Sequence, residues 1–201
     1  MTRRIVYGIG LWLTLAATAL SIASIIEPRW LAYDVEGHGK HGKSVHISYG
    51  LHKRCDSVTG SCRDFPEYED CHGDSWQFCS RWRTVGFLVS FAVVIELAAL
   101  IGYAVVLLGG KQKRDAGWKM ISGLLFVAGA VSCAAMAIVG FKAFLFDHDD
   151  RFFPPGWRLD SSWILCTVSW SISIITACGL IGAAIVLPEE GDYELIPEGR
   201  M

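Results

Sequence analysis

The chain has no excess of positive charge. Its 201 residues include 18 Lys and Arg against 20 Asp and Glu, which gives a formal net charge of −2. A nucleic-acid-binding face normally carries clustered Lys and Arg that neutralise phosphates, often with interleaved aromatic rings, and no such stripe is present. The sequence therefore predicts no nucleic-acid partner.

The sequence also lacks the motifs of common hydrolytic sites. It contains no GxSxG or HExxH pattern, and no paired-carboxylate site can be recognised on a polar loop. Its polar histidines and aspartates form no Ser/His/Asp or Cys/His arrangement that their spacing supports. We therefore expect a non-enzymatic protein with no catalytic residues and no cofactor.

Four long segments are nearly free of polar residues. The predicted spans are residues 5–26, 85–108, 119–146 and 162–187. Each reaches the roughly 20 residues that cross about 30 Å of hydrocarbon, whereas a soluble domain would place polar residues at helical or strand period within such segments. We therefore expect a mainly α membrane protein built as a bundle of four transmembrane helices.

The first span begins like a signal peptide, because Arg3 and Arg4 precede it. Its apolar stretch exceeds the roughly 7–15 residues of a signal core, and the polar segment 27–29 closes it without a small-residue cleavage site. We expect this segment to be retained as a signal anchor.

The spans divide the rest of the chain between the two sides of the membrane. Residues 1–4, 109–118 and 188–201 fall on one side, and residues 27–84 and 147–161 fall on the other. The positive-inside rule discriminates weakly here, because Lys and Arg flank the spans on both sides. The charge pattern alone leaves the orientation open.

Four of the seven cysteines, Cys55, Cys62, Cys71 and Cys79, lie in the polar segment 27–84. An even number of clustered cysteines indicates a disulfide framework, which persists only in an oxidising compartment. We therefore expect this segment to be extracellular, the termini to be cytoplasmic, and the protein to lie in the plasma membrane. Three pairings are possible, and we favour bonds between neighbours, Cys55–Cys62 and Cys71–Cys79.

Zinc binding is the alternative use of these cysteines, since His46, His52 and His72 lie nearby. The segment has no CxxC or HxxxH spacing of the kind that structural zinc sites typically show. We therefore expect no metal site here.

The same segment contains the alternating pattern of β-strands. Residues 30–35 begin with aromatic and β-branched residues, and apolar and polar residues alternate over 45–51. The glycine-rich stretch 37–42 predicts the tip of a hairpin between them, and residues 56–60 predict a second turn. We expect a small antiparallel sheet formed by the first outer loop, with a core too small to be stable without disulfides.

Six residues of the first loop and the start of the second span follow a pattern known from one superfamily of membrane proteins. They are Trp30, Gly50, Leu51, Cys55, Cys62 and Arg81. The pattern resembles the W…GLW…C…C signature of claudins, peripheral myelin protein, the epithelial membrane proteins and the calcium-channel gamma subunits. With the four-span layout, the resemblance covers nearly the whole chain. It implies a left-handed four-helix bundle capped by a small β-sheet, with Cys55 and Cys62 bonded across two strands.

The sequence also departs from the claudin pattern. His52 stands where the signature has its second tryptophan, the interval from Cys55 to Cys62 is shorter than in claudins, and two further cysteines are present. The chain ends in Met201 without the PDZ-binding end of claudins. We therefore interpret the chain as a divergent member of the superfamily rather than as a true claudin.

Glu96 lies near the middle of the second span, where a charged side chain costs about 2.5–3.5 kcal/mol. One interpretation is an ion- or proton-sensing site within the bundle. The other, which we favour, is a protonated carboxyl that hydrogen-bonds to a neighbouring helix. The candidate partners at similar depth are Thr18, Ser132, Ser173 and Thr176.

Small residues recur every four positions along the fourth span, at Ser169, Ser173 and Ala177, and Cys178 and Gly182 add a similar pair. Such a face allows close helix packing, either within the bundle or against another membrane protein. We favour packing within the bundle.

The second outer loop and the C-terminal tail contain further candidate sites. Phe152, Phe153 and Trp157 predict either an aromatic belt at the membrane interface or a protruding contact for a partner. In the acidic tail, the segment from Tyr193 to Ile196 fits the YxxΦ sorting pattern, which is degenerate enough to arise often by chance.

These features predict a cell-surface tetraspan that organises membrane domains or cell adhesion, as a scaffold, through its outer loops. The expected partners are membrane lipids and other membrane proteins, either laterally or across a cell contact: a channel, a receptor or a second copy of the chain. The alternatives are an auxiliary subunit of a channel or receptor and a component of a paracellular barrier or pore. The missing second tryptophan and the missing PDZ-binding end argue against a barrier or pore component, and the isolated acid at Glu96 argues against a transmembrane conduit.

Overall fold

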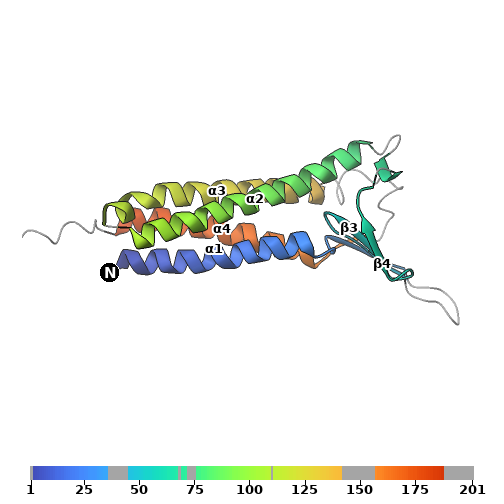
Figure 1. The fold of residues 1–201 in the computed structure, drawn as a ribbon, viewed down its shortest axis with the longest axis horizontal. Coiled ribbons are helices and arrows are strands. Elements are labelled where there is room, and N and C mark those ends of the chain that lie inside the picture. The colour runs from blue at the N-terminus through green and yellow to red at the C-terminus, as the bar shows by residue number, and fades with distance from the viewer. Residues whose placement is uncertain are drawn as a thin grey trace, which may run out of the picture.

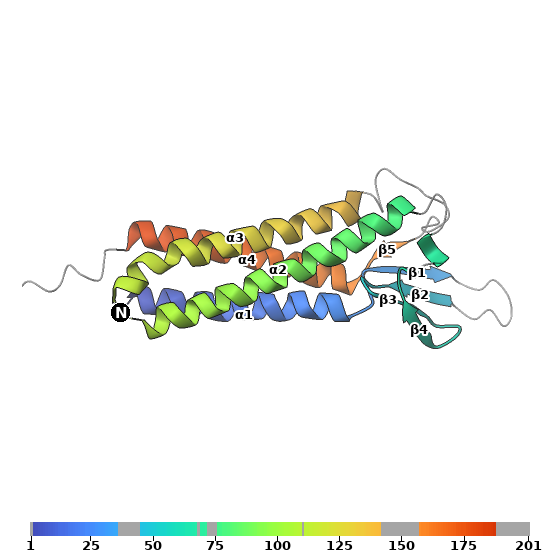
Figure 2. The ribbon, with the colours of Figure 1, turned by 45° about the horizontal axis from the view of Figure 1, so that its top comes forward.

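The computed structural model describes residues 2–35, 45–67, 69–71, 76–109, 111–141 and 157–187. Four helices lie side by side, and a β-sheet stands at one end of them (Figures 1 and 2). The helices are α1 (Thr2–Ile26), α2 (Trp76–Leu108), α3 (Lys111–Phe141) and α4 (Ser161–Val186). The expected fold class, a four-helix membrane bundle with a small antiparallel sheet, is confirmed.

All four helices are long and apolar enough to cross a membrane. The shortest has 25 residues, and at 1.5 Å per residue it exceeds the roughly 30 Å of the hydrocarbon core. Large apolar side chains such as Ile5, Phe87 and Ile175 point outward and are more than half exposed. A surface of this kind is suited to lipid, and the chain is an integral membrane protein.

Two helices begin eight or nine residues before the predicted spans. α2 begins at Trp76 rather than at residue 85, and α3 begins at Lys111 rather than at residue 119. The predicted loop 109–118 is therefore mostly the start of α3, and the last nine residues of the predicted outer loop 27–84 are helical. Polar and charged residues mask these turns from an apolar-run criterion, although nothing in them prevents a helix.

Each helix packs against two neighbours, so that α1 and α3 both lie between α2 and α4. Small residues allow the close approaches. A Cβ atom added at Gly129 of α3 would lie 2.7 Å from Ile174 Cδ1 of α4. The Ile174 side chain would have to move, and the same Cβ would lie 3.3 Å from the backbone oxygen of Trp170, so Gly129 allows α3 and α4 to pack closely here.

The sheet contains β1 (Leu31–Val35), β2 (Val45–Tyr49), β3 (Lys53–Asp56), β4 (Ser61–Asp64) and β5 (Arg158–Leu159). The strands are antiparallel and their order is β4-β3-β2-β1-β5. β1 and β2 form the predicted hairpin, whose tip at 36–44 lies outside the described residues. The predicted second turn joins β3 to β4 and places Gly60 at a φ of 61°.

We expected the first outer loop alone to form the sheet, but the second loop contributes a strand as well. β5 comes from the second loop and pairs with β1, where Leu159 lies opposite Leu31. Two further bonds extend this pairing: Asp160 N donates to Trp30 O at 3.1 Å, and Ser162 N donates to Arg29 O at 3.0 Å. A strand of two residues has no periodicity that a sequence pattern could detect. It forms because the edge of β1 offers unpaired backbone groups.

Candidate functional site

Three of the six residues that carry the family resemblance, Trp30, Gly50 and Leu51, lie where the sheet joins the bundle. We call this region the joint, defined by Trp30 and Leu51 with Val85 and Val89 of α2 and Cys166 of α4. The Trp30 side chain is fully buried, and its Nε1–H donates to Ser24 O in the last turn of α1 at 2.7 Å. Trp30 therefore fills the core of the joint and also pairs one of the carbonyls left open at a helix end.

Gly50 is required at the joint by the close approach of two backbone segments. An added Cβ would lie 2.5 Å from Pro28 Cα, and that atom belongs to backbone. The neighbouring backbone is held by two bonds: Trp30 N donates to Tyr49 O at 2.8 Å, and Gly50 N donates to Lys53 O at 2.7 Å. A side chain at this position would separate the sheet from the end of α1.

His52 and Arg81 lie at the edge of this region rather than in its core. His52 is exposed, and its ring would be 3.4 Å from a Cβ at Gly86 of α2. Arg81 is exposed on α2 and donates to Gln77 Oε1 at 3.5 Å. The residue that replaces the second tryptophan of the signature thus lies against α2, outside the core of the joint.

Both predicted disulfides are present, in the predicted pairing. Cys55 and Cys62 lie opposite each other on β3 and β4, with 4.1 Å between their Cα atoms. Cys71 and Cys79 connect the short 3₁₀ helix η1 (Glu69–Cys71) to the start of α2, with a Cα separation of 5.8 Å. Each bond closes a loop of seven or eight residues. The loop-entropy relation gives each bond a stabilisation of about 2.5 kcal/mol.

Aromatic residues form a second core between the sheet and the first turns of α2. Phe78 and Trp82 of α2 pack with Phe65 and Tyr49, and ring centroids in this cluster are 4.7–6.2 Å apart. The α2 turns that precede the predicted span therefore supply the sheet with a hydrophobic core. This core explains why α2 continues as a helix above the membrane.

Trp157 belongs to this aromatic core, which differs from the expectation that the second-loop aromatics face the membrane interface or protrude towards a partner. Its ring stacks on Tyr33 at a centroid distance of 4.9 Å and meets the edge of Tyr49 at 4.9 Å. The pairing of β5 with β1 brings Trp157 over the sheet. Phe152 and Phe153 lie outside the described residues.

A charged cluster ties three strands together on the surface of the sheet. His46 Nδ1 of β2 bonds to Asp34 Oδ1 of β1 at 2.5 Å, and Arg158 Nη2 of β5 lies 2.7 Å from Asp34 Oδ2. The hydrogen bond from His46 and the charge of Arg158 lower the pKa of the Asp34 carboxyl, although partial desolvation acts in the opposite direction. Asp34 therefore holds the second loop against the first.

The described residues contain no group of three or more His, Cys, Asp or Glu side chains arranged to hold a metal ion. The cysteines near the candidate zinc ligands are oxidised, and His46 is bonded to Asp34. His72 lies outside the described part of the chain.

The bundle has a polar core around Glu96, which is 1% exposed. Ser173 Oγ of α4 donates to Glu96 Oε1 at 3.2 Å, as expected, while Oε2 has no hydrogen-bond partner among the described residues. The Thr18 hydroxyl lies within interaction range of the same carboxyl, together with two that were not expected, those of Ser21 and Ser169. The other two candidate partners, Ser132 and Thr176, are buried in the bundle.

Serine residues continue this polar core along the contact between α1 and α4. Ser21 Oγ and Ser169 Oγ lie 2.7 Å apart, and Ser169 Oγ is 2.8 Å from Ala17 O. Two helices can approach closely enough for such hydroxyl–hydroxyl and hydroxyl–carbonyl bonds because the residues at the contact have small side chains. The polar core thus fastens α4 to α1 and encloses the carboxyl of Glu96.

The small residues of α4 separate into two groups. Ser169, Ser173 and Ala177 are buried at 1%, 0% and 0% exposure, so they face the inside of the bundle. Cys178 and Gly182 are exposed, and a Cβ added at Gly182 would meet nothing within 4 Å. Only the first group packs within the described part of the bundle, and Gly182 lies on its outer surface.

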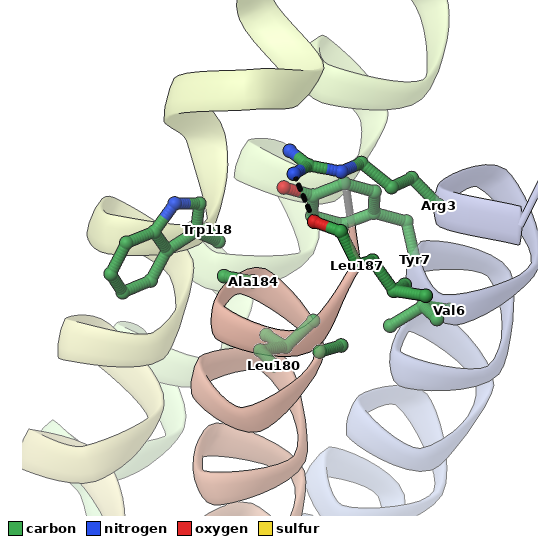
Figure 3. A pocket seen from close by; sticks show the side chains of 8 residues that line it. Arg3, Val6, Tyr7, Trp118, Leu180, Ala184 and Leu187 are labelled. Atoms are coloured by element: carbon green, nitrogen blue, oxygen red, sulfur yellow. Dashed lines mark hydrogen bonds between the residues drawn. The ribbon is translucent and has the colours of Figure 1, made fainter. Parts of the chain in front are cut away.

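The opposite end of the bundle is closed by Arg3. Its Nη2 donates to Leu187 O, just past the end of α4, at 2.9 Å (Figure 3). The cavity beside this bond, lined by Tyr7, Trp118 and Leu180 among others, has a volume of about 10 Å³, which is room for about one water molecule. Arg3 therefore acts as a cap for the last turn of α4, and this cavity is too small for a ligand.

The two residues of the candidate sorting motif in the tail, Tyr193 and Ile196, lie outside the described residues.

The segment between β1 and β2 also matches the sequence pattern of a phosphate-binding loop. Residues 37–44 read GHGKHGKS, which fits the GxxxxGK[ST] spacing of a phosphate-binding P-loop. A P-loop joins a strand to a helix whose N-terminus faces the phosphates, whereas this segment joins β1 to the antiparallel strand β2. The flanking structure gives the match no support as a nucleotide site.

No protein-family model matches the chain, and no curated protein matches it.

Proposed function

We propose that the protein is a non-enzymatic, claudin-like tetraspan that works by contact, organising membrane domains or cell adhesion through the β-sheet and its disulfide-bonded loops. In this proposal the sheet lies outside the plasma membrane and both termini lie in the cytoplasm. The order of the signature residues and the position of Trp30, Gly50 and Leu51 at the joint support the family assignment. The two disulfides support the orientation, because such bonds persist in oxidising compartments.

The observation that carries the proposal is the β3–β4 hairpin. Among the described strands, β4 is one of the two edge strands of the sheet, and all four of its residues are exposed. Val58, in the turn, is an apolar side chain that is 65% exposed. The Cys55–Cys62 bond holds this hairpin in one conformation, which lowers the entropy lost when a partner binds. An exposed strand edge also offers unpaired backbone groups to a strand of the partner.

A second candidate function, an auxiliary subunit bound laterally to a channel or receptor, is favoured by the outer face of α4. Cys178 and Gly182 are exposed there between large apolar side chains, and Ile175 and Ile185 are 67% and 76% exposed. Small residues on an outward face would let the helix of another protein approach closely.

A photo-crosslinking amino acid placed in turn at Val58 and at Ile175 distinguishes the two functions. Both positions are exposed, so each serves as the control for the other. In native membranes, the contact function predicts a discrete protein adduct from Val58 and only lipid adducts from Ile175. A stoichiometric protein adduct from Ile175 alone would assign the lateral function instead, and no protein adduct from either position would contradict both.

The orientation has its own test, which uses a membrane-impermeant maleimide. Val58→Cys at the sheet and Lys113→Cys at the start of α3 lie at opposite ends of the bundle, and both side chains are exposed. We expect labelling of the first in intact cells, and of the second only after the membrane is permeabilised. Labelling of both in intact cells would contradict the four-span topology.

A further inference from the structure

A groove of about 460 Å³ lies on the outer face of α2, at the height where the helix leaves the predicted span. It is lined by the Cys71–Cys79 disulfide and by Trp76, Ser80, Arg83, Thr84 and Phe87. This is the side of α2 that faces away from the sheet, because Phe78 and Trp82 cover the sheet from the other side. The groove is therefore not part of the joint or of the aromatic core.

The groove holds a cation that no other described residue neutralises. Arg83 is exposed and lines the groove, and the described part of the chain provides it with no ion-pair or hydrogen-bond partner. Other arginines of this end of the protein are occupied: Arg63 pairs with Glu67 and Asp70 at 3.0 Å each, and Arg158 pairs with Asp34. An unpaired guanidinium beside a wall of apolar and hydroxyl groups favours an anionic ligand.

An apolar stripe continues from the groove down the helix. Phe87, Phe91, Val94 and Ile101 are 67%, 45%, 61% and 67% exposed. Their spacing of three, four and seven residues places them on one side of α2. The rings of Phe87 and Phe91 are parallel within 5°, with centroids 6.0 Å apart, so they form a continuous apolar surface below Arg83.

The height of these residues matches the layers of a bilayer. The predicted apolar span begins at residue 85, so Arg83 lies about 3 Å above the hydrocarbon boundary and Phe87 about 3 Å below it. Trp76 is 67% exposed at the top of the groove, in the manner of aromatic residues near the membrane–water interface. The cation is therefore at the level of lipid phosphates, and the apolar stripe is at the level of acyl chains.

We propose that this groove binds an anionic phospholipid of the leaflet on the sheet side, such as phosphatidylglycerol. Arg83 pairs with the phosphate, the Ser80 hydroxyl and the Trp76 ring contact the polar headgroup, and an acyl chain lies along Phe87 and Phe91. The covalent link between η1 and α2 fixes one wall of the groove, so that the site is formed before the lipid arrives.

The test measures which lipids stay bound after the full chain is extracted from nanodiscs of equal parts phosphatidylglycerol and phosphatidylcholine. Native mass spectrometry should find phosphatidylglycerol retained in preference. Arg83→Gln should lower its retention about fivefold, the effect expected for one basic residue at a membrane surface. Arg81→Gln is the matched control, because Arg81 is exposed on the same helix but does not line the groove. It should leave retention unchanged, and Arg83→Lys should keep most of it.

Equal retention by Arg83→Gln and Arg81→Gln, or no preference between the two lipids, would overturn the proposal. Competition by chain-free glycerophosphoglycerol at the same concentration would show that the site binds a free phosphate rather than a lipid. If Arg83→Gln does not fold, the site can still be tested with the unsubstituted chain and a photoreactive lipid. Phosphatidylglycerol with a photoreactive acyl chain should label residues 76–91, and labelling confined to other helices would refute the site.

Discussion

The joint leads to a prediction about Trp30 whose size follows from the structure. The Trp30 side chain is fully buried between the sheet and three helices, and its Nε1–H pairs a carbonyl of α1. Truncation of a buried tryptophan to alanine costs about 3–5 kcal/mol, since the transfer energy is lost and a cavity remains. Trp30→Phe keeps most of the apolar volume but loses the hydrogen bond and leaves a small cavity. Together these two losses should cost about 1–2 kcal/mol.

Trp12 provides a matched control in α1. It is the same residue type but is 71% exposed on the outer surface of the bundle, so Trp12→Ala should change the free energy of unfolding by no more than about 0.5 kcal/mol. The assay is denaturant-driven unfolding in mixed micelles. A residue-level measurement is also needed, because a lower global free energy of unfolding does not show that the destabilised region is the joint. Amide exchange should accelerate on β1 and β2 before it does on α4.

Two results would refute the reasoning on the joint. If Trp30→Ala and Trp12→Ala cost the same, burial at the joint would not be the source of stability. If exchange rises equally in the sheet and in all four helices, Trp30 would stabilise the bundle as a whole rather than connect the sheet to it.

Three further predictions follow from the site. Glu96→Gln should preserve assembly and surface delivery because it still accepts a hydrogen bond from Ser173, whereas Glu96→Leu should reduce both, and equal tolerance would remove Glu96 as a site. Replacement of Cys55 and Cys62 by serine should lower the free energy of unfolding by about 2.5 kcal/mol, measured as above, while an unchanged value would exclude a stabilising role for the bond. Because the pKa of Asp34 is lowered by folding, its carboxylate adds stability that is fully present above the unfolded pKa of about 3.9 and is lost as the pH falls through the lowered folded value. Amide exchange at β1 should therefore accelerate in acid. In Asp34→Asn this acid-dependent acceleration should be absent.

The parts of the fold that the sequence predicts are those with a local pattern. The apolar runs predict four helices, the alternation over 45–51 predicts β2, and the spacing of four cysteines makes the nearest-neighbour pairing plausible. β5 is not predictable in this way, because its two residues form a strand only where β1 presents an open edge. The helical start of α2 is missed for a related reason, since Phe78 and Trp82 are stabilised by a sheet that is distant in sequence.

The same distinction applies to the site residues. Glu96 is conspicuous in the sequence because a carboxyl interrupts an apolar span, and Ser173 is among the partners expected at its depth. Ser21 and Ser169 could not be chosen from the sequence, since which serines face the carboxyl depends on the rotation of α1 and α4 about their axes. In the sequence Arg83 is one of several charges that flank the spans, and only the folded chain shows that it is exposed and has no partner among the described residues.

The sheet shows how a small β-structure can remain ordered with little core of its own. Its inner part uses the end of the bundle as a core, through Trp30 and Leu51, and its face is covered by the first turns of α2. Its outer part, β3 and β4, has almost no buried side chains and depends on the Cys55–Cys62 bond. The packed core therefore supports the inner strands of the sheet, whereas the exposed surface belongs to β3 and β4. Substitutions on the exposed hairpin should cost little stability, which leaves its surface free to be shaped by the partner it contacts.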